Sequence, residues 1–349
     1  MRIAQVAPLY ESVPPKLYGG SERVVSYLTE ELVKQGHEVT LFASGDSNTR
    51  ANLQAVTTNA LRLKGSCRDP LAHHVLLLEK VFQEAAEYDI VHFHIDYLHF
   101  PLSRLLKIPH VTTMHGRLDL ADLEPVFMEF SDMPVVSISN SQRGPLPMAN
   151  WQGTVYNGVP EDLYSFHPER GNYLAFIGRF SPEKRVDRAI EIARRADMEI
   201  RIAAKIDQTD KSYFKERIKP LLNHPLVTFV GEIGEREKDD FLGNAAALLF
   251  PIDWPEPFGL VMIEAMACGT PVIAYRHGAV PEVLRDGITG FIVDNLEDAV
   301  TAVHRVPMLN RSRCRQVFEE RFSAEKMADG YLAVYRKIIN INQMPHLAA

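Results

Sequence analysis

The sequence predicts an α/β protein of two doubly wound, Rossmann-like domains, and three observations support this prediction. Short apolar runs of strand length alternate with segments of helical periodicity along the whole chain. Such alternation indicates parallel sheets with helices on both faces. The scheme occurs twice, and a length of 349 residues favours two domains over one.

The first half of the chain contains five apolar runs that we predict as buried strands. Between them lie segments with apolar residues at helical spacing, such as residues 21–35 and 71–88. The predicted strands are residues 3–7, 38–43, 89–95, 110–114 and 135–139.

The second half repeats this pattern. Ser181-Pro182-Glu183 predicts the start of a helix with Ser181 as its N-cap. The buried stripe of that helix is predicted at Val186, Ala189, Ile190 and Ala193. The predicted strands are residues 173–177, 199–203, 227–230, 247–250, 271–275 and 290–293.

Turn signals at residues 156–160 place a linker near residues 158–170. We therefore predict an N-terminal domain of residues 1–163 and a C-terminal domain of residues 164–324. Apolar residues at helical spacing after Ser323 predict a final helix, which makes residues 325–349 a separate terminal segment.

The composition excludes several classes of protein. A net charge of −7 argues against a general affinity for nucleic acid. Cys67, Cys268 and Cys314 form no CxxC pair, which argues against a disulfide framework or a zinc site. No signal-peptide pattern opens the chain, and no apolar run approaches the roughly 20 residues that span a bilayer. We expect a cytoplasmic protein.

Three clusters that follow predicted strands carry candidate chemistry, because open α/β sheets bind ligands beyond the carboxyl ends of their strands. Gly19-Gly20 at a helix start allows close approach of a ligand to free N–H groups, or forms a plain helix-entry turn. Residues 178–185 place two or three cations beside a helix start, which suits a diphosphate or a solvated basic face.

The third cluster is the strongest. Glu256 precedes a helix predicted to start near Gly259, and Glu264 lies one turn into it. Two carboxylates there can accept hydrogen bonds from vicinal hydroxyls flanking an anion at the helix end. The alternative for an arbitrary pair is a capping carboxylate and a surface helix residue.

These motifs resemble those of retaining glycosyltransferase family 4. Glu256 and Glu264 are similar to its E-x7-E signature, and residues 178–184 to its G-R-x-x-x-x-K segment. Gly19-Gly20 with residues 36–39 resembles its N-terminal signature, and residues 112–116 its strand-end histidine. The resemblance covers nearly the whole chain. It implies a GT-B fold, with two domains facing across a cleft and a C-terminal helix that crosses back to the N-terminal domain.

The resemblance also implies roles for individual residues. Arg179, Lys184, Glu256 and His115 would act on the donor at the reacting centre. The diphosphate would be held by Arg179, Lys184 and the Gly19-Gly20 loop, the ribose by Glu264, and the sugar by Glu256 and His115. The implied donor-binding set is Gly19, Gly20, Arg179, Lys184, Lys205, Glu232, Ile233, Glu256, Phe258, Gly259, Leu260, Val261 and Glu264.

Two positions keep open alternatives. Lys205 stands where the family often has a glycine-rich turn, so it either adds a phosphate contact or points outward. His92, His94 and Asp96 alternate along one strand end; they give only a partial metal-ligand set, and a strand-end hydrogen bond or an acceptor contact is favoured.

The implied reaction is transfer of a hexose with retention of configuration and without a metal or other cofactor. The donor is expected to be UDP-glucose, with GDP-mannose second. Alternatives are a nucleotide-sugar 2-epimerase of GT-B fold and a catalytically silent nucleotide-sugar binder.

The acceptor is expected on the N-terminal domain. Residues 1–163 carry a net charge of −6, which opposes binding to an anionic membrane surface. The loops after the strands there mix aromatic and charged groups and suit a soluble small molecule or saccharide. The candidate acceptor-side residues are Tyr10, Lys16, His94, Asp96 and Arg117.

Overall fold

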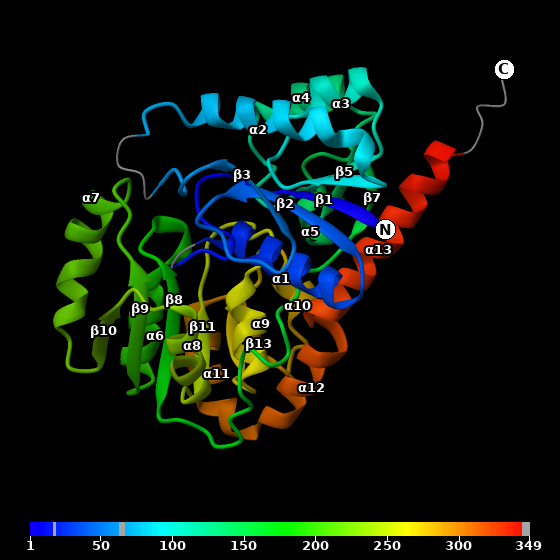
Figure 1. Cartoon of the computed structure of the whole chain (residues 1–349). Coiled ribbons are helices and arrows are strands. Elements are labelled where there is room, and N and C mark those ends of the chain that lie inside the picture. The colour runs from blue at the N-terminus through cyan, green and yellow to red at the C-terminus, as the bar shows by residue number, and fades with distance from the viewer. Residues whose placement is uncertain (17–18, 63–66, 344–349) are drawn as a thin grey trace. The chain divides into compact units, whose positions relative to one another are not determined.

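The computed structural model describes residues 1–16, 19–62 and 67–343 (Figure 1). Met1–Gly158 and the chain from Ala324 onward form one compact unit, unit 1, and Val159–Ser323 form unit 2. The chain thus passes between units at residue 158, within the segment expected to be the linker. Residues 17–18 of the glycine loop and residues 344–349 of the terminal segment lie outside the described residues.

Unit 1 is built on a parallel sheet of seven strands among its described residues, in the order β3-β2-β1-β4-β5-β6-β7. Its strands are β1 Arg2–Val6, β2 Glu38–Ser44, β3 Asn52–Thr57, β4 Ile90–Phe93, β5 His110–Met114, β6 Pro134–Ser137 and β7 Asn150–Thr154. Its helices are α1 Gly20–Lys34, α2 Pro70–Glu84, α3 Phe100–Leu106, α4 Leu123–Glu129, α5 Asn140–Arg143 and α13 Ala324–Gln343, with a 3-10 turn at Ala85–Glu87.

Alternate residues of the unit 1 strands pack on opposite faces of the sheet. Phe42 of β2 packs with Leu77 of α2 in one core cluster. Its neighbours Leu41 and Ala43 pack with Val25 of α1 in another. Helices therefore cover both faces, as the doubly wound prediction requires, and Figure 1 shows α2, α3 and α4 grouped on the side away from α1.

Unit 2 repeats the plan with a six-stranded parallel sheet among the described residues, in the order β10-β9-β8-β11-β12-β13. Its strands are β8 Tyr173–Arg179, β9 Glu199–Lys205, β10 Val227–Gly231, β11 Ala247–Phe250, β12 Val272–Tyr275 and β13 Gly290–Val293. Its α-helices are α6 Val186–Arg195, α7 Lys211–Tyr213, α8 Glu235–Gly243, α9 Leu260–Ala267, α10 Val280–Val283, α11 Leu296–Arg305 and α12 Arg311–Arg321. Its 3-10 helices are η2 Pro182–Lys184, η4 Lys219–Asn223 and η5 Val306–Met308, and η3 Phe214–Ile218 is a π-helix.

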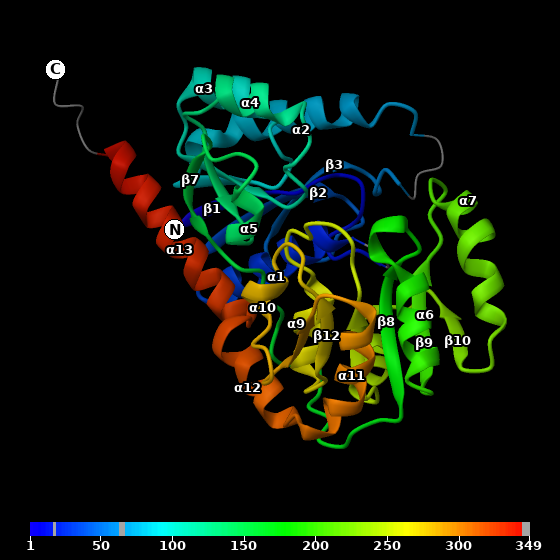
Figure 2. The ribbon, with the colours of Figure 1, turned by 180° about the vertical axis from the view of Figure 1, so that it is seen from behind.

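The core of unit 2 packs α6 and α11 against one face of this sheet (Figure 2). Val186, Ala189, Ile190 and Ala193 are all buried there, which confirms the predicted stripe. In both units the strand order reverses beside the first strand of the unit, between β1 and β4 and between β8 and β11. Such a switch point is where doubly wound sheets take ligands.

The start of α6 differs from the prediction. Pro182–Lys184 form a 3-10 turn, Arg185 adopts a left-handed conformation at φ 53°, and the α-helix begins only at Val186. Ser181 therefore does not cap α6, and the predicted N-cap is wrong. The break separates Lys184 from the helix that follows it.

Two strands were not predicted from the sequence. β3 and β7 are the edge strands of unit 1, and most of their residues are partly or fully exposed. An edge strand needs no continuous apolar run, so the pattern that reveals buried strands is missing from both.

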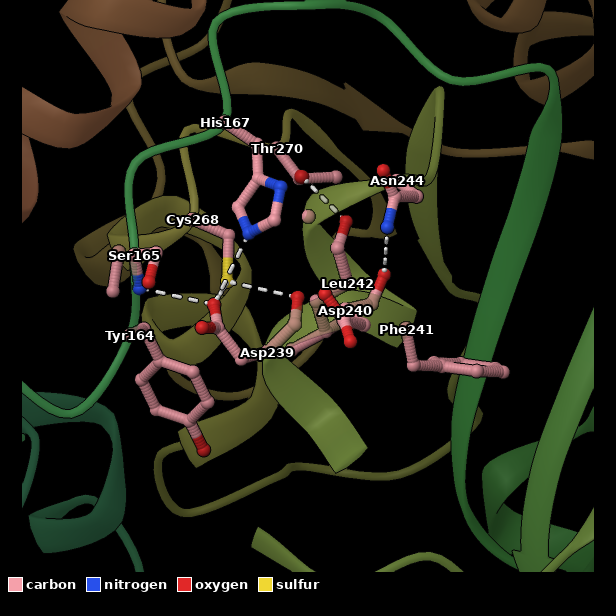
Figure 3. A network of polar contacts seen from close by, with 12 residues as sticks. Tyr164, Ser165, His167, Asp239, Asp240, Phe241, Leu242, Asn244, Cys268 and Thr270 are labelled. Carbon is pink, nitrogen blue, oxygen red and sulfur yellow. Dashed lines mark hydrogen bonds and ion pairs between the residues drawn. The ribbon is translucent and has the colours of Figure 1, made fainter. Parts of the chain in front are cut away.

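The connection into unit 2 is fastened to α8 and α9 by polar contacts (Figure 3). Oδ1 of Asp239 accepts a hydrogen bond from the backbone N–H of Ser165 at 2.9 Å and lies 3.2 Å from Nε2 of His167. The sulfur of Cys268 lies 3.8 Å from the same oxygen, and burial raises the pKa of this thiol. Cys268 therefore stays protonated and serves packing rather than chemistry.

The last helix, α13, belongs to unit 1 although it follows unit 2 in the chain. Tyr331 and Tyr335 of α13 are fully buried and hydrogen-bond to side chains of the unit 1 sheet. The predicted return of the final helix to the N-terminal domain is confirmed. Across residues 1–16, 19–62 and 67–343, none of the helices combines the length and the apolar character that crossing a bilayer requires.

Candidate functional site

Charged candidate residues of unit 2 lie at the carboxyl edge of its sheet. Arg179 is the last residue of β8, and it pairs in register with Lys205, the last residue of β9. The loop that follows β11 carries Glu256 and leads into α9. Because β9, β8 and β11 are neighbours in the sheet, these groups share one edge.

Lys184 and Glu256 contact each other directly. Nζ of Lys184 donates to the carboxylate of Glu256, and Nε1 of Trp254 donates to the same oxygen at 2.9 Å. Nζ of Lys184 also lies 5.2 Å from the ring centroid of Trp254 and 5.7 Å from that of Phe250. Aromatic faces attract cations, so the ammonium group is held between two rings and a carboxylate.

Arg179 is held by two carboxylates. Its guanidinium donates to Glu183 at 2.6 Å and lies 3.1 Å from Oδ2 of Asp210. Burial tends to raise the pKa of Glu183, but hydrogen bonds from its own backbone, Ser181 and Arg179 leave that pKa below its usual value. The pKa of Asp210 is raised, chiefly by desolvation, although Arg179 opposes the shift.

Glu264 is buried, with only 2% of its surface exposed. Its two carboxylate oxygens accept hydrogen bonds from Nζ of Lys238 in α8 at 2.8 and 2.9 Å. The alternative reading of Glu264 as a surface helix residue is therefore wrong. Lys238 was missed, because a single lysine inside the acidic stretch of residues 235–240 looks like part of a solvated face.

Among the described residues, the start of α9 has no side-chain cap. Gly259 is the N-cap at φ 84°, a conformation that L-residues rarely adopt, and a Cβ there would meet Cε of Met262 at 2.8 Å. A glycine offers no capping side chain to the first N–H groups of the helix. Leu260 and Val261, which carry two of those groups, are partly exposed, whereas Phe258 is buried.

The remaining donor-side candidates of unit 2 are less constrained. Lys205 lies 3.9 Å from Asp207 and is partly exposed. Glu232 is exposed in the turn after β10. Ile233 borders a cavity of about 650 Å³ beside Tyr173 and Arg201.

In unit 1 the candidate histidines are linked to each other. Nε2 of His115, after β5, lies 2.8 Å from Nδ1 of His94, after β4. Nε2 of His94 lies 2.7 Å from Oε1 of Gln5 in β1. Burial lowers the pKa of His115 to about 4 and that of His94 well below its usual value, so both rings are neutral near pH 7.

The expected strand-end hydrogen bonds of His92 and His94 are present. Nδ1 of His92 lies 2.7 Å from the hydroxyl of Tyr335, and Nε2 lies 2.7 Å from Oγ1 of Thr113. Both nitrogens of each ring are thus engaged by protein groups. Among the described residues, no set of three or more His, Cys, Asp and Glu side chains is arranged to hold a metal ion.

The other unit 1 candidates are spread along the loops. Tyr10, Lys16, Asp96 and Arg117 are exposed, and Arg117 is paired with Asp119 at 2.7 and 2.8 Å. Gly19 has a packing reason of its own, since a Cβ there would meet Cβ of Pro15 at 2.7 Å. Gly20 is the first residue of α1.

Two family profiles match the chain. One, described as "Glycosyltransferase Family 4", matches residues 18–151, and the other, "Glycosyl transferases group 1", matches residues 164–316. Together they span most of the chain, and the protein is a glycosyltransferase. It belongs to glycosyltransferase family 4.

Relatives of similar length carry specific names. N-acetyl-alpha-D-glucosaminyl L-malate synthase of Bacillus anthracis is 27% identical over 92% of this chain and 94% of its own. Alpha-maltose-1-phosphate synthase of Mycobacterium tuberculosis is 26% identical over 96% of this chain and 99% of its own.

Solved structures share the fold. Sucrose-phosphate synthase of Thermosynechococcus elongatus matches with a TM-score of 0.77 at 18% identity, over 97% of this chain and 99% of its own. HepE of Anabaena, in complex with UDP-glucose, matches with a TM-score of 0.75 at 18% identity, over 97% of this chain and 100% of its own. The two Rossmann-like units with a returning C-terminal helix therefore form a GT-B fold.

Proposed function

We propose that this glycosyltransferase moves a hexose, with retention of configuration, from a nucleoside-diphosphate sugar to a soluble small molecule or saccharide. UDP-glucose is the first candidate donor, and GDP-mannose the second. The pairing of Lys184 with Glu256 beside the start of α9 carries the proposal. The crystal structure of HepE with UDP-glucose supports the choice of donor.

The carboxyl edge of the unit 2 sheet suits a diphosphate. Arg179, Lys184 and Lys205 supply positive charge there, and the first N–H groups of α9 add the positive end of a helix dipole. Arginine can grip phosphate oxygens with two parallel hydrogen bonds, while lysine acts as a point charge.

We propose that binding of the donor exchanges the partner of Lys184. A diphosphate oxygen and the carboxylate of Glu256 are both anionic and repel each other beside the same Nζ, which favours displacement of Glu256 from Lys184 by the phosphate. The released carboxylate then accepts a hydrogen bond from a sugar hydroxyl. Glu264 accepts from the ribose in the same way, with Lys238 sharing its charge.

The same groups favour departure of the nucleoside diphosphate. Fixed cations and helix N–H groups stabilise the negative charge that develops on the leaving phosphate, which is the task a divalent metal performs in other enzymes. We therefore propose a metal-independent reaction. The acceptor attacks from the leaving-group side, and the departing phosphate oxygen takes its proton, so no protein nucleophile is needed.

Unit 1 contributes His115 toward the donor sugar and binds the acceptor. Tyr10, Lys16, Asp96 and Arg117 are exposed and remain candidates for acceptor contact. His94 is 3% exposed, and both of its ring nitrogens are hydrogen-bonded to protein groups. We therefore propose that His94 does not contact the acceptor and instead positions His115. The net charge of −6 on residues 1–163 supports a soluble acceptor and a cytoplasmic enzyme.

Incubation of the full chain with UDP-glucose, followed by mass spectrometry, tests the proposal. Slow release of UDP and free glucose is the expected result. An altered sugar still attached to UDP would indicate an epimerase, and tight binding without change would indicate a silent binder. Proton NMR of freshly released sugar tests retention, which predicts that the α-anomer appears first.

A further inference from the structure

Seven buried or partly buried side chains of unit 1 form one continuous hydrogen-bonded chain from His115 to the last helix. Three strands and α13 contribute to it, so residues up to 330 positions apart meet. Besides the His115–His94–Gln5 and Tyr335–His92–Thr113 contacts, it includes the bond from Nε2 of Gln5 to the Tyr335 hydroxyl at 3.1 Å and the bond from Oγ1 of Thr113 to the Tyr331 hydroxyl at 2.9 Å.

The amide of Gln5 determines which atoms donate and which accept in the two hydrogen bonds that lead to His115. Its oxygen can only accept, so Nε2 of His94 carries a proton and donates it at 2.7 Å. A neutral imidazole carries one proton, so Nδ1 of His94 is an acceptor. Nε2 of His115 must then donate to it across the 2.8 Å contact.

The hydrogen bonds from Tyr331 back to Gln5 independently give the same donor-to-acceptor direction. Oγ1 of Thr113 donates its proton to Tyr331, so it accepts from Nε2 of His92. Nδ1 of the neutral His92 therefore accepts from the hydroxyl of Tyr335. That hydroxyl, having given its proton, accepts from Nε2 of Gln5, which agrees with the orientation of the amide.

All six hydrogen bonds thus run the same way, and each polarises the next. For His115 the consequence is specific. Its single ring proton is committed to Nε2, and Nδ1 keeps an unprotonated lone pair. In the part of the chain that the structure describes, no hydrogen bond to Nδ1 of His115 is found.

We propose that Gln5 is a positioning residue that, through His94, fixes His115 as the Nε2–H tautomer and presents its Nδ1 as an acceptor for a hydroxyl of the donor sugar. The inference rests on the proposed function only in placing His115 beside that sugar. A lone pair favours a sugar with a hydroxyl at this point over one with a carboxylate, which offers no proton. Gln5 itself is fully buried, so in this proposal it acts through His94 and not by direct contact with the sugar.

The tautomers can be measured without any activity assay. In the full chain labelled with 15N-histidine, with His115→Asn to assign signals, we expect N–H protons on Nε2 of both His94 and His115. A coupling across the hydrogen bond should join the His115 Nε2–H to Nδ1 of His94. A proton on Nδ1 of His94 would overturn the inference, whatever the activity of the enzyme.

Gln5→Met tests the positioning role. We expect loss of the coupling between the two rings and a KM for UDP-glucose raised roughly tenfold, the loss expected for about one hydrogen bond. Inhibition by UDP, which has no sugar, should be unchanged. Thr112→Val is the matched control. It removes a 2.6 Å hydrogen bond to another buried histidine, His99, which is not part of the hydrogen-bonded series from His115 to Tyr331.

The outcomes separate this inference from the proposed function. If UDP-glucose shifts the resonances of His115 and UDP does not, both are supported. If the tautomers are as expected but UDP-glucose leaves His115 unmoved, the contact with the sugar is wrong. If Gln5→Met fails to fold, the tautomers of the unsubstituted protein still decide the question.

Discussion

Lys184 and Glu256, separated by 72 positions in the sequence, share a hydrogen-bonded ion pair in which 18% and 12% of their side chains are exposed. Trp254 donates to the same carboxylate oxygen and also offers its ring to the lysine. The pair places the proposed phosphate-binding cation and the proposed sugar-binding carboxylate in contact. In the proposed function, donor binding replaces this contact with contacts to the phosphate and the sugar.

This exchange predicts different results for the two residues. Glu256→Gln removes the anion that competes for Lys184, so affinity for UDP should be unchanged or higher while transfer from UDP-glucose falls. Lys184→Ala should lower both, with turnover reduced roughly 100-fold or more, as for a lost transition-state contact. Calorimetry with UDP and with UDP-glucose separates the effects, and a weaker binding of UDP by Glu256→Gln would contradict the exchange.

Arg179→Ala should reduce turnover by roughly 100-fold to 1000-fold, because it removes a cation that faces the developing charge on the leaving group. Its ion pairs lie partly in solvent, so the melting temperature should change little. Arg195→Ala is the matched control, since Arg195 also pairs with two carboxylates but lies on α6 away from the strand ends. Equal turnover in the two variants would remove Arg179 from the phosphate site.

Lys238→Met should destabilise unit 2 by about 3 kcal/mol, because it leaves the buried carboxylate of Glu264 without its partner. The double variant Lys238→Met, Glu264→Leu should recover most of that stability while nucleotide binding stays lost. Urea unfolding measures the stabilities, and thermal shift with UDP reports the binding. Additive losses in the double variant would show that the two side chains do not act as a pair.

Transfer activity should persist in excess EDTA, since the proposed site supplies its positive charge from Arg179, Lys184 and α9. The test is turnover of UDP-glucose by protein dialysed against chelator, with and without added magnesium or manganese. Loss of activity that either metal restores would show that the cations of the protein are not sufficient.

Unit 1 should lose stability as the pH falls below about 6.5, the ordinary pKa of histidine. Burial lowers the pKa of His92, His94, His99 and His115 in the folded unit. Below pH 6.5 the unfolded chain therefore binds more protons than the folded unit does, which favours unfolding. Each such histidine removes about 1.4 kcal/mol per pH unit until its folded pKa is reached.

The two tryptophans of the chain make this measurable, because Trp151 lies in unit 1 and Trp254 in unit 2. Urea unfolding of Trp254→Phe at pH 8 and pH 5 follows unit 1, and that of Trp151→Phe follows unit 2. We expect the larger loss at pH 5 in the Trp151 signal. Equal losses of stability in the two units would show that the acid sensitivity does not arise from the buried histidines of unit 1.

Buried strands could be predicted from the sequence because they depend on local patterns, whereas the start of α6 was predicted wrongly. β11, for example, is a run of four apolar residues bounded as predicted at residues 247 and 250. The interaction partners of the candidate site residues could not be predicted from the sequence. Lys238, Asp210 and Gln5 each act through a residue far away in the sequence, and nothing in their own neighbourhoods distinguishes them from solvated or core positions.

The helix α13 is synthesised after all of unit 2, yet it completes unit 1, which also contains β1. Domains fold as units on the ribosome, usually from the N-terminus. Here all residues of unit 2 are synthesised before α13. Until α13 is made, β1, β4 and β5 lack the hydrogen-bond partners Tyr331 and Tyr335. A chain that stops early therefore carries a finished unit 2 and a unit 1 whose buried polar groups lack their partners. Completion of unit 1 therefore requires synthesis through α13.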